Sequence, residues 1–131
     1  MDMGIKGKTA LICGSSKGLG RGCAEALAAE GVNLVMNART SSILERTAEK
    51  IRNTYKVEVK TIACDVTTVD GQNKVFDTIS NLDILVTNAG GPPPGMWHDW
   101  EQEDFLAALN ANMLTPIAFI KAYLPGMIAQ G

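Results

Sequence analysis

The stretch LICGSSKGLGRG, residues 11–22, decides the fold because it places a glycine- and serine-rich turn between an apolar run and a helical pattern. The apolar run, residues 9–13, predicts a short β-strand. Apolar side chains then recur with helical spacing, and this pattern ends at Gly31. The helical positions are Leu19, Cys23, Ala26 and Leu27. The chain is therefore expected to begin with a strand, a glycine-rich turn and a helix.

A turn of this kind can bind a diphosphate, because its amide groups approach the ligand closely and the helix dipole favours negative charge. Gly14 is expected to make the sharp turn, Gly18 to leave room for the ligand, and Gly20 to let the helix pack on the strand. Ser15 and Ser16 add hydroxyl donors. The spacing is G-x-x-x-G-x-G, and the G-x-G-x-x-G form is absent. Taken alone, the pattern also suits an ordinary strand-to-helix turn.

The alternation of strands and helices continues along the chain. Further strands are expected over residues 33–39, 57–66 and 82–91, and helices over residues 41–55, about 70–80 and 101–124. Such alternation predicts an α/β fold of the Rossmann type, in which a doubly wound parallel sheet lies between two helix layers. Residues 1–131 are expected to form one domain. The fourth strand is apolar on both faces yet has no later strand beside it, so the fold is expected to be incomplete on its C-terminal side.

Composition limits the kinds of partner. The 131 residues carry a net charge of −2 without a strongly basic segment, which excludes nucleic acid and an anionic membrane surface as expected partners. No stretch reaches the apolar length of a membrane span, and the start lacks a signal-peptide pattern, so a soluble cytoplasmic protein is expected. Cys13, Cys23 and Cys64 are expected to be buried reduced thiols, and His98 has no second ligand for a metal site.

The end of the second strand discriminates between dinucleotides. An NAD site of this type has an acidic residue about 20 residues beyond the loop, whereas an NADP site needs cations for the 2′-phosphate. This chain has Asn37, Ala38 and Arg39 there. Together with Lys17 in the loop, Arg39 supplies two cations for one phosphate, so NADP(H) is the expected cofactor. The plain alternative is a solvated arginine that follows a strand.

Four short motifs occur in order along the chain: GSSKGLG at 14–20, CDV at 64–66, NAG at 88–90 and NAN at 110–112. With them the sequence resembles the short-chain dehydrogenase/reductase family, and within it the reductases similar to 3-oxoacyl-acyl-carrier-protein reductase. The resemblance runs from about residue 9 to residue 128. It implies an oxidoreductase that transfers a hydride from NADPH to a ketone such as a 3-oxoacyl thioester, with a small ketone or alcohol as substrate.

The resemblance also implies roles for individual residues. Asp65 would accept a hydrogen bond from the adenine amino group, and Val66 would contact the ring through its backbone. The NAG motif would line the cofactor cleft with Asn88, Ala89 and Gly90. The cofactor loop would contribute Gly14, Ser15, Ser16, Lys17, Gly18, Leu19 and Gly20. Thr87 is a mild departure, because many members have a second asparagine at its position.

Asn112 is the expected catalytic residue of this chain. Pro116 follows it by four residues and has no amide hydrogen, so a regular helix cannot pair the carbonyl group of Asn112. The family uses this asparagine to hold a water in a proton relay to a lysine, which a local break in the helix suits. A kink without catalytic meaning is the alternative.

The sequence departs from the family in its catalytic residues. The reaction needs a Tyr-x-x-x-Lys pair and a serine. Here Tyr55 is followed four residues later by Val59, and Tyr123 by Met127. In the family these residues follow the next strand, so they are expected in a remaining C-terminal half. The alternative is a non-catalytic dinucleotide-binding or interaction module.

The last helix is apolar on more than one side. Phe119 and Tyr123 lie beside the stripe and are expected to mediate association, because the family commonly builds its homodimer or homotetramer from this helix. Alternatively, both aromatic side chains widen the core face. The main stripe is Met113, Ile117, Ile120, Leu124, Met127 and Ile128. In the preceding loop, Trp97 and Trp100 are expected to close over the nicotinamide end of the site or to pack at its base.

Overall fold

A four-stranded parallel sheet forms the centre of the chain, for which a computed structural model describes residues 1–131. The strands are β1 (Thr9–Ile12), β2 (Asn33–Ala38), β3 (Val59–Ala63) and β4 (Ile84–Val86), and they lie in the order β3-β2-β1-β4. Ile12 of β1 pairs with Met36 on one side and Val86 on the other. The order reverses at β1, and in open parallel sheets a ligand crevice forms outside the carboxyl ends of the strands at such a point.

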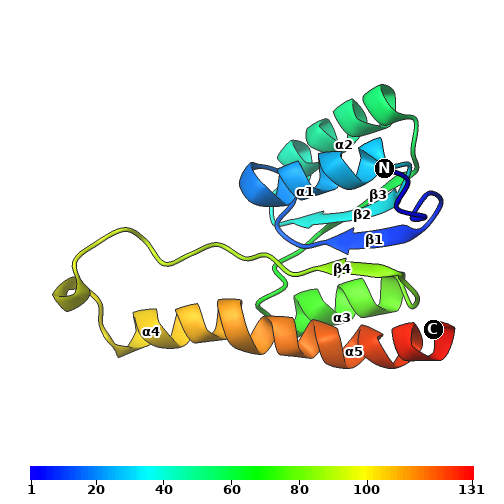
Figure 1. The fold of residues 1–131 in the computed structure, drawn as a ribbon. Helices are drawn as coiled ribbons and strands as arrows, with labels where there is room; N and C mark the ends of the chain where they lie inside the picture. Colours follow the sequence, from blue (N-terminus) through cyan, green and yellow to red (C-terminus); the bar gives the residue numbers. More distant parts are fainter.

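Helices cover both faces of the sheet, which confirms the Rossmann-type architecture (Figure 1). Helices α1 (Gly18–Ala29) and α2 (Ser41–Tyr55) lie on one face, above the sheet in Figure 1. Helices α3 (Val69–Thr78) and α5 (Thr115–Gln130) lie on the other. The expected elements therefore exist, although β3 and β4 are shorter than the apolar runs that predicted them.

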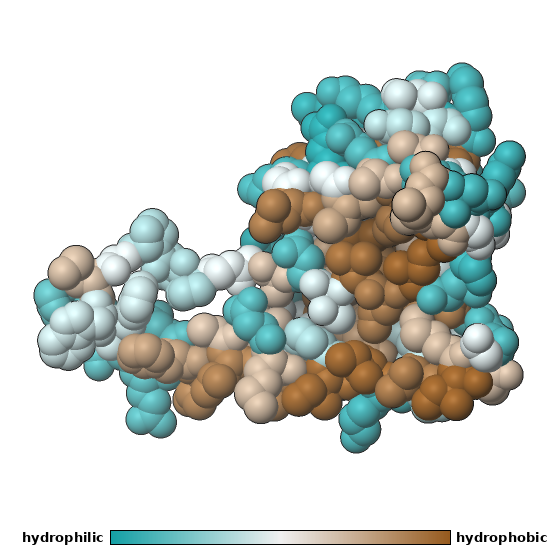
Figure 2. Space-filling view, viewed as in Figure 1, coloured by the Kyte–Doolittle hydropathy of each residue, from teal (hydrophilic) through white to brown (hydrophobic).

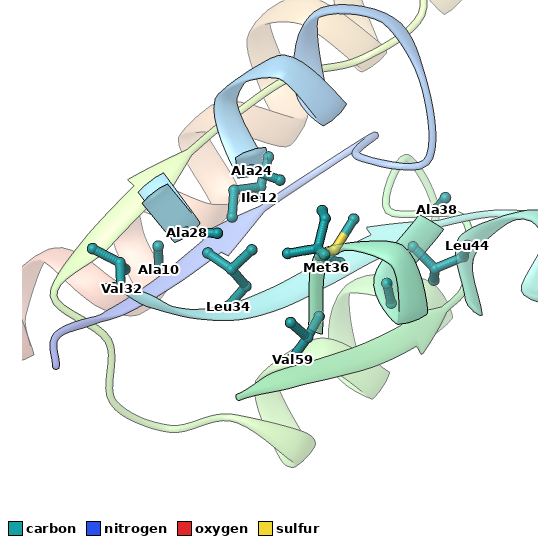
Figure 3. Packing of buried hydrophobic residues seen from close by; sticks show 12 residues of the cluster. Ala10, Ile12, Ala24, Ala28, Val32, Leu34, Met36, Ala38, Leu44 and Val59 are labelled. Carbon is teal, nitrogen blue, oxygen red and sulfur yellow. The ribbon is translucent and has the colours of Figure 1, made fainter. Parts of the chain in front are cut away.

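Each central strand supplies side chains to two hydrophobic clusters, because neighbouring residues of a strand point to opposite faces. Ile12 and Met36 belong to the cluster beneath α1 and α2, whose 12 buried residues are drawn in Figure 3. Leu11 and Val35 belong to the cluster beneath α3 and α5. Burial on both faces explains why these strands read as continuous apolar runs.

Small residues make the buried face of α1, and this corrects the expected apolar stripe. Gly20, Ala24 and Ala28 are buried, whereas Leu19 is 85% exposed and Cys23 is also exposed. A helix that approaches a strand closely leaves room only for small side chains. The expectation that all three cysteines are buried is wrong for Cys23 and holds fully only for Cys13, since Cys64 is half-buried.

The expected break in the long helix is present. Helix α4 (Gln102–Leu109) passes into a π-helical turn, Asn110–Leu114, and then into α5. The amide of Thr115 donates to the carbonyl of Asn110, five residues back. Because Pro116 has no amide hydrogen, one backbone carbonyl group of the π-helical turn has no hydrogen-bond donor within the helix.

The buried face of α5 differs from the expected one. Phe119 and Tyr123 are buried against the sheet, and both contact the ring of Phe76 edge-on, with centroids 5.1 and 5.7 Å away. The expected association through Phe119 and Tyr123 is therefore wrong, and the alternative, that they belong to the core face, is correct. Most of the expected core stripe, including Ile120 and Leu124, is exposed instead.

By length and composition alone, the helical segment Gln102–Gln130 is apolar enough to cross a membrane. The expectation that no stretch reaches this limit is wrong for that segment. A core helix of a globular protein that is mostly buried passes the same test, but only 11% of the apolar window of this segment is buried. Phe119 and Tyr123 are the side chains through which α5 packs on the sheet.

Candidate dinucleotide-binding site

A hollow of about 550 Å³ lies at the carboxyl ends of the strands, where the strand order reverses. The loops after all four strands line it. Of the residues predicted from the sequence, it brings together Gly14, Ser16, Lys17, Gly18, Leu19, Asn37, Arg39, Asp65, Val66, Asn88, Ala89 and Gly90. Ser15 and Gly20 do not line it, and Asn112 lines a smaller neighbouring cavity.

The glycines of the first loop meet different constraints. Gly14 and Gly18 have φ angles of +58° and +60°, which favour glycine. A Cβ atom on Gly20 would lie 2.2 Å from the carbonyl oxygen of Gly14, whereas one on Gly18 would meet nothing within 4 Å. Gly20 is therefore required by internal packing, and Gly18 leaves an open approach to the backbone from the hollow.

Asn88 fastens the first loop to the loop after β4. Its side-chain amide donates to the carbonyl of Gly14 over 3.1 Å. A Cβ atom on Gly14 would lie only 2.8 Å from the same amide nitrogen. The asparagine and the glycine thus depend on each other, and together they shape one wall of the hollow.

The two serines of the first loop are placed differently. Ser15 is completely buried, and its hydroxyl accepts from the amide of Asn37 and donates to the carbonyl of the same residue, at 3.1 and 3.2 Å. Ser16 lines the hollow, and its carbonyl accepts from Thr47 of α2. Only Ser16 is therefore positioned to offer its hydroxyl to a ligand.

The charged side chains of the hollow are two cations and one carboxylate. Lys17 and Arg39 line it after β1 and β2, and Asp65 lines it after β3. The hydroxyl and the amide of Thr67 both donate to Oδ1 of Asp65 and lower the pKa of this carboxyl group, and the nearby Arg39 lowers it further. Asp65 is thus held ionised, with both local hydrogen bonds on one of its two oxygens.

Sequence reasoning missed several contributors to the hollow. Thr40 and Ile43 line it from the start of α2, and Ala111 from the π-helical turn. Asn110 ties this turn to the loop after β3, because its side-chain amide donates to the carbonyl of Thr67 over 2.9 Å. These positions carry no periodic signal, since they depend on which loops the fold brings together.

The smaller cavity, of about 180 Å³, lies beside the π-helical turn and shares residues such as Asn88 and Ala111 with the hollow. Asn112 lines it, and the side-chain amide of Asn112 donates to the carbonyl of Ala108 over 3.1 Å. The hydroxyl of Thr115 also belongs to this cavity, and it is buried without a hydrogen-bond partner.

The tyrosine nearest in sequence to this turn is Tyr123, which is buried in the core rather than exposed in either cavity. Burial is the larger cause that raises the pKa of Tyr123 to about 12, and the nearby thiol of Cys13 adds to it. Its hydroxyl donates to the carbonyl of Ile79 over 2.9 Å. Tyr123 is a structural residue of the α3 and α5 layer.

The tryptophan loop does not cover the hollow, which corrects the expectation for Trp97 and Trp100. The chain after β4 runs away from the sheet through a short 3-10 turn, Trp97–Asp99, before α4 returns (Figure 1). Trp97 is 77% exposed, and Trp100 packs edge-on against Phe105. Residues 91–99, which include Pro92, Pro93 and Pro94, are all exposed.

Comparisons with known proteins show the family and the fold of this chain. The family model described as short chain dehydrogenase matches residues 8–131. L-sorbose reductase from Gluconobacter frateurii, solved with NADPH and L-sorbose, is 33% identical and superposes with a TM-score of 0.91 over 100% of this chain and 51% of that one. The 3-oxoacyl-acyl-carrier-protein reductase FabG of Aquifex aeolicus is 35% identical over 134 residues, which cover 99% of this chain and 54% of FabG.

A further relative is the uncharacterized oxidoreductase YvaG of Bacillus subtilis, 30% identical over 131 residues, 99% of this chain and 50% of YvaG. The chain thus spans about half the length of these relatives. The family model matches nearly the whole of this chain, residues 8–131, and the superposition with L-sorbose reductase covers all of it. The chain belongs to the short-chain dehydrogenase family.

Proposed function

We propose that this chain forms the cofactor-binding part of an NADPH-dependent short-chain reductase that reduces a ketone such as a 3-oxoacyl thioester. The carrying observation is that Lys17 and Arg39 line one hollow while no acidic residue ends β2. An acidic residue there favours the free ribose hydroxyls of NAD, whereas cations favour the 2′-phosphate of NADP. The L-sorbose reductase of similar structure was solved with NADPH, which supports the same choice.

The residues of the hollow fit a dinucleotide. The amide groups at the start of α1 and the open side of Gly18 suit a diphosphate. Asp65 suits the adenine amino group, because its ionised carboxylate is a pure acceptor. Ile43, at the entrance of the same hollow, offers an apolar surface to the ring.

The nicotinamide supplies the hydride when the cofactor is bound. The π-helical turn with Asn112 is proposed to hold a water molecule of the path that delivers the proton. The missing amide hydrogen of Pro116 leaves a carbonyl oxygen beside Asn112 able to accept from water. Neither tyrosine of this sequence is followed by lysine four residues later. The Tyr, Lys and Ser of the reaction are therefore proposed to lie in a C-terminal half of the fold.

A second candidate function rests on that same missing pair. A module that binds the dinucleotide without reducing a ketone needs only the hollow. An intact-mass measurement of all polypeptide in a purified sample that binds NADPH, combined with an assay of ketone reduction, separates the two candidates. A longer chain or a second fragment supports the reductase, whereas a sample of this chain alone that binds NADPH and reduces no ketone supports the module.

Arg39→Asp tests the cofactor assignment. We expect NADPH to bind about tenfold or more weakly, because a carboxylate repels the 2′-phosphate, while NADH binds no worse than before. Affinities are measured by titration of the cofactor's fluorescence. Arg46→Asp is the control, because Arg46 is an exposed residue of α2 outside the hollow. An unchanged preference in Arg39→Asp contradicts the role of Arg39.

A further inference from the structure

The side-chain amide of Asn37 donates all of its hydrogen bonds to the end of β3 and the residue that follows it. Asn37 is 2% exposed. Its side-chain nitrogen Nδ2 lies 2.9 Å from the carbonyl oxygen of Ile62, 3.2 Å from that of Cys64 and 3.3 Å from the Cys64 sulfur. Two amide hydrogens are thus shared among three acceptors. The side-chain nitrogen has no donor capacity left for a ligand.

The backbone of Asn37 holds the loop after β1. Its carbonyl oxygen accepts from the amide of Ser15 at 2.8 Å and from the Ser15 hydroxyl at 3.2 Å, and its own amide donates back to this hydroxyl at 3.1 Å. Ser15 is completely buried. One residue of β2 therefore connects the loops that follow β1 and β3, which lie on either side of it.

Each of these two loops also has contacts that do not involve Asn37: the loop after β3 has contacts to neighbouring residues, and the loop after β1 has contacts to the loop after β4 and to α2. In the loop after β3, Thr67 donates to Asp65, and the side-chain amide of Gln72 donates to the carbonyl of Val66. In the loop after β1, Gly14 accepts from Asn88, and Ser16 from Thr47. The backbones of β2 and β3 also pair up to this point, as in the hydrogen bond from the amide of Cys64 to the carbonyl of Ala38. Asn37 adds direct contacts to both the loop after β1 and the loop after β3.

We propose that Asn37, together with Ser15, is a positioning residue that sets the separation between the diphosphate-binding loop and the adenine-binding loop. The inference rests on the proposed function. A ligand that occupies two linked subsites gains affinity only when their separation matches its length. Asparagine suits the task because its amide donates to two carbonyl groups, whereas an aspartate would place acceptors against acceptors.

The test compares a ligand that spans both loops with one that reaches only the adenine side. NADPH and adenosine, which carries no phosphate for Lys17 of the first loop, are titrated calorimetrically into the full chain carrying Asn37→Ala or Ser15→Ala. Asn33→Ala is the matched control. Asn33 also joins β2 to the start of β3, since its Oδ1 accepts from the amide of Glu58 at 3.1 Å. It lies at the amino end of β2, whereas the hollow lies at the carboxyl ends of the strands.

We expect both variants to bind NADPH at least about fivefold more weakly while their affinity for adenosine stays within about twofold, because only the longer ligand needs both loops. Asn33→Ala should change neither affinity. Equal losses for the two ligands, or no loss for NADPH, overturn the proposal. Ser15→Ala decides the matter if Asn37→Ala does not fold, because it removes only one hydroxyl. If the unmodified chain binds neither ligand, the proposed function fails and this inference fails with it.

Discussion

At the scale of single residues, the glycines of the first loop divide into those that serve packing and those that leave open space. Gly20 lies on the buried face of α1, where an added Cβ atom would meet the Gly14 carbonyl oxygen at 2.2 Å. Gly22 belongs to the same helix, and an added Cβ atom there meets nothing within 4 Å. The two positions therefore separate the need for close packing from the general cost of glycine in a helix.

Gly20→Ala is expected to lower the free energy of unfolding by about 1–3 kcal/mol, because the neighbouring atoms belong to backbone that cannot move aside. Gly22→Ala should be neutral or stabilising by up to about 1 kcal/mol, since alanine favours a helix. Urea unfolding followed by circular dichroism measures both. Equal effects of the two substitutions would show that the close contact at Gly20 carries no cost.

Chemistry at this scale made much of the site predictable. The glycines of the first loop and the arginine in place of an acidic residue after β2 can be read directly from the sequence. The structure then gives Gly14 and Gly18 the positive φ angles that glycine favours. The burial of Ser15 was not predictable in this way. Its hydroxyl faces Asn37 rather than the hollow because the two residues meet only when β1 and β2 pair.

At the scale of elements, α5 shows where periodicity loses its power. The helix was predicted, but its buried face was not, because apolar residues occur on several sides of it and aliphatic and aromatic stripes compete. The contact with Phe76 of α3 selects the aromatic side. Helix α1 shows the opposite case, since close approach to the sheet buries small residues that a search for large apolar side chains passes over.

The packing of α5 on the sheet makes stability sensitive to alkaline pH. Burial raises the pKa of Tyr123 to about 12, from 10.0, and that of Cys13 to about 12, from 9.0. A group whose pKa is raised on folding stabilises the fold fully below its ordinary pKa. This contribution is lost as the pH rises toward the raised value, by roughly 1.4 kcal/mol per pH unit for each group.

Tyr123→Phe should therefore change the pH profile as well as the stability. At pH 8 the variant is expected to be less stable by about 1 kcal/mol, because the hydrogen bond to Ile79 is lost. Between pH 8 and pH 11 it should lose about 1 kcal/mol less than the unmodified chain, because phenylalanine does not titrate. Urea unfolding at both pH values provides the comparison, and parallel losses in the two proteins would rule out Tyr123 as a source of alkaline sensitivity.

At the scale of the whole molecule, the layer formed by α4 and α5 presents an apolar surface to solvent. Figure 2 shows hydrophobic residues along these helices and in the recess above them, toward the edge of the sheet. The exposed apolar side chains of the two helices and the turn between them are Phe105, Leu106, Leu109, Met113, Leu114, Ile117, Ile120, Leu124 and Ile128. An exposed apolar surface of this kind is typical of a site that contacts another protein or a membrane.

Ile120 is expected to lie within a surface through which copies of this chain associate. Sedimentation velocity should show a mass that rises with concentration, and Ile120→Glu should shift it toward that of one chain, because a buried unpaired carboxylate opposes association. Ala122→Glu is the control because it adds the same charge to the same helix. Ala122 is exposed but lies outside the apolar surface. If the mass stays at that of one chain at all concentrations, the chain does not associate and Ile120 has no such role. If the mass falls equally in both variants, the added charge alone explains the effect, which also contradicts a role of Ile120.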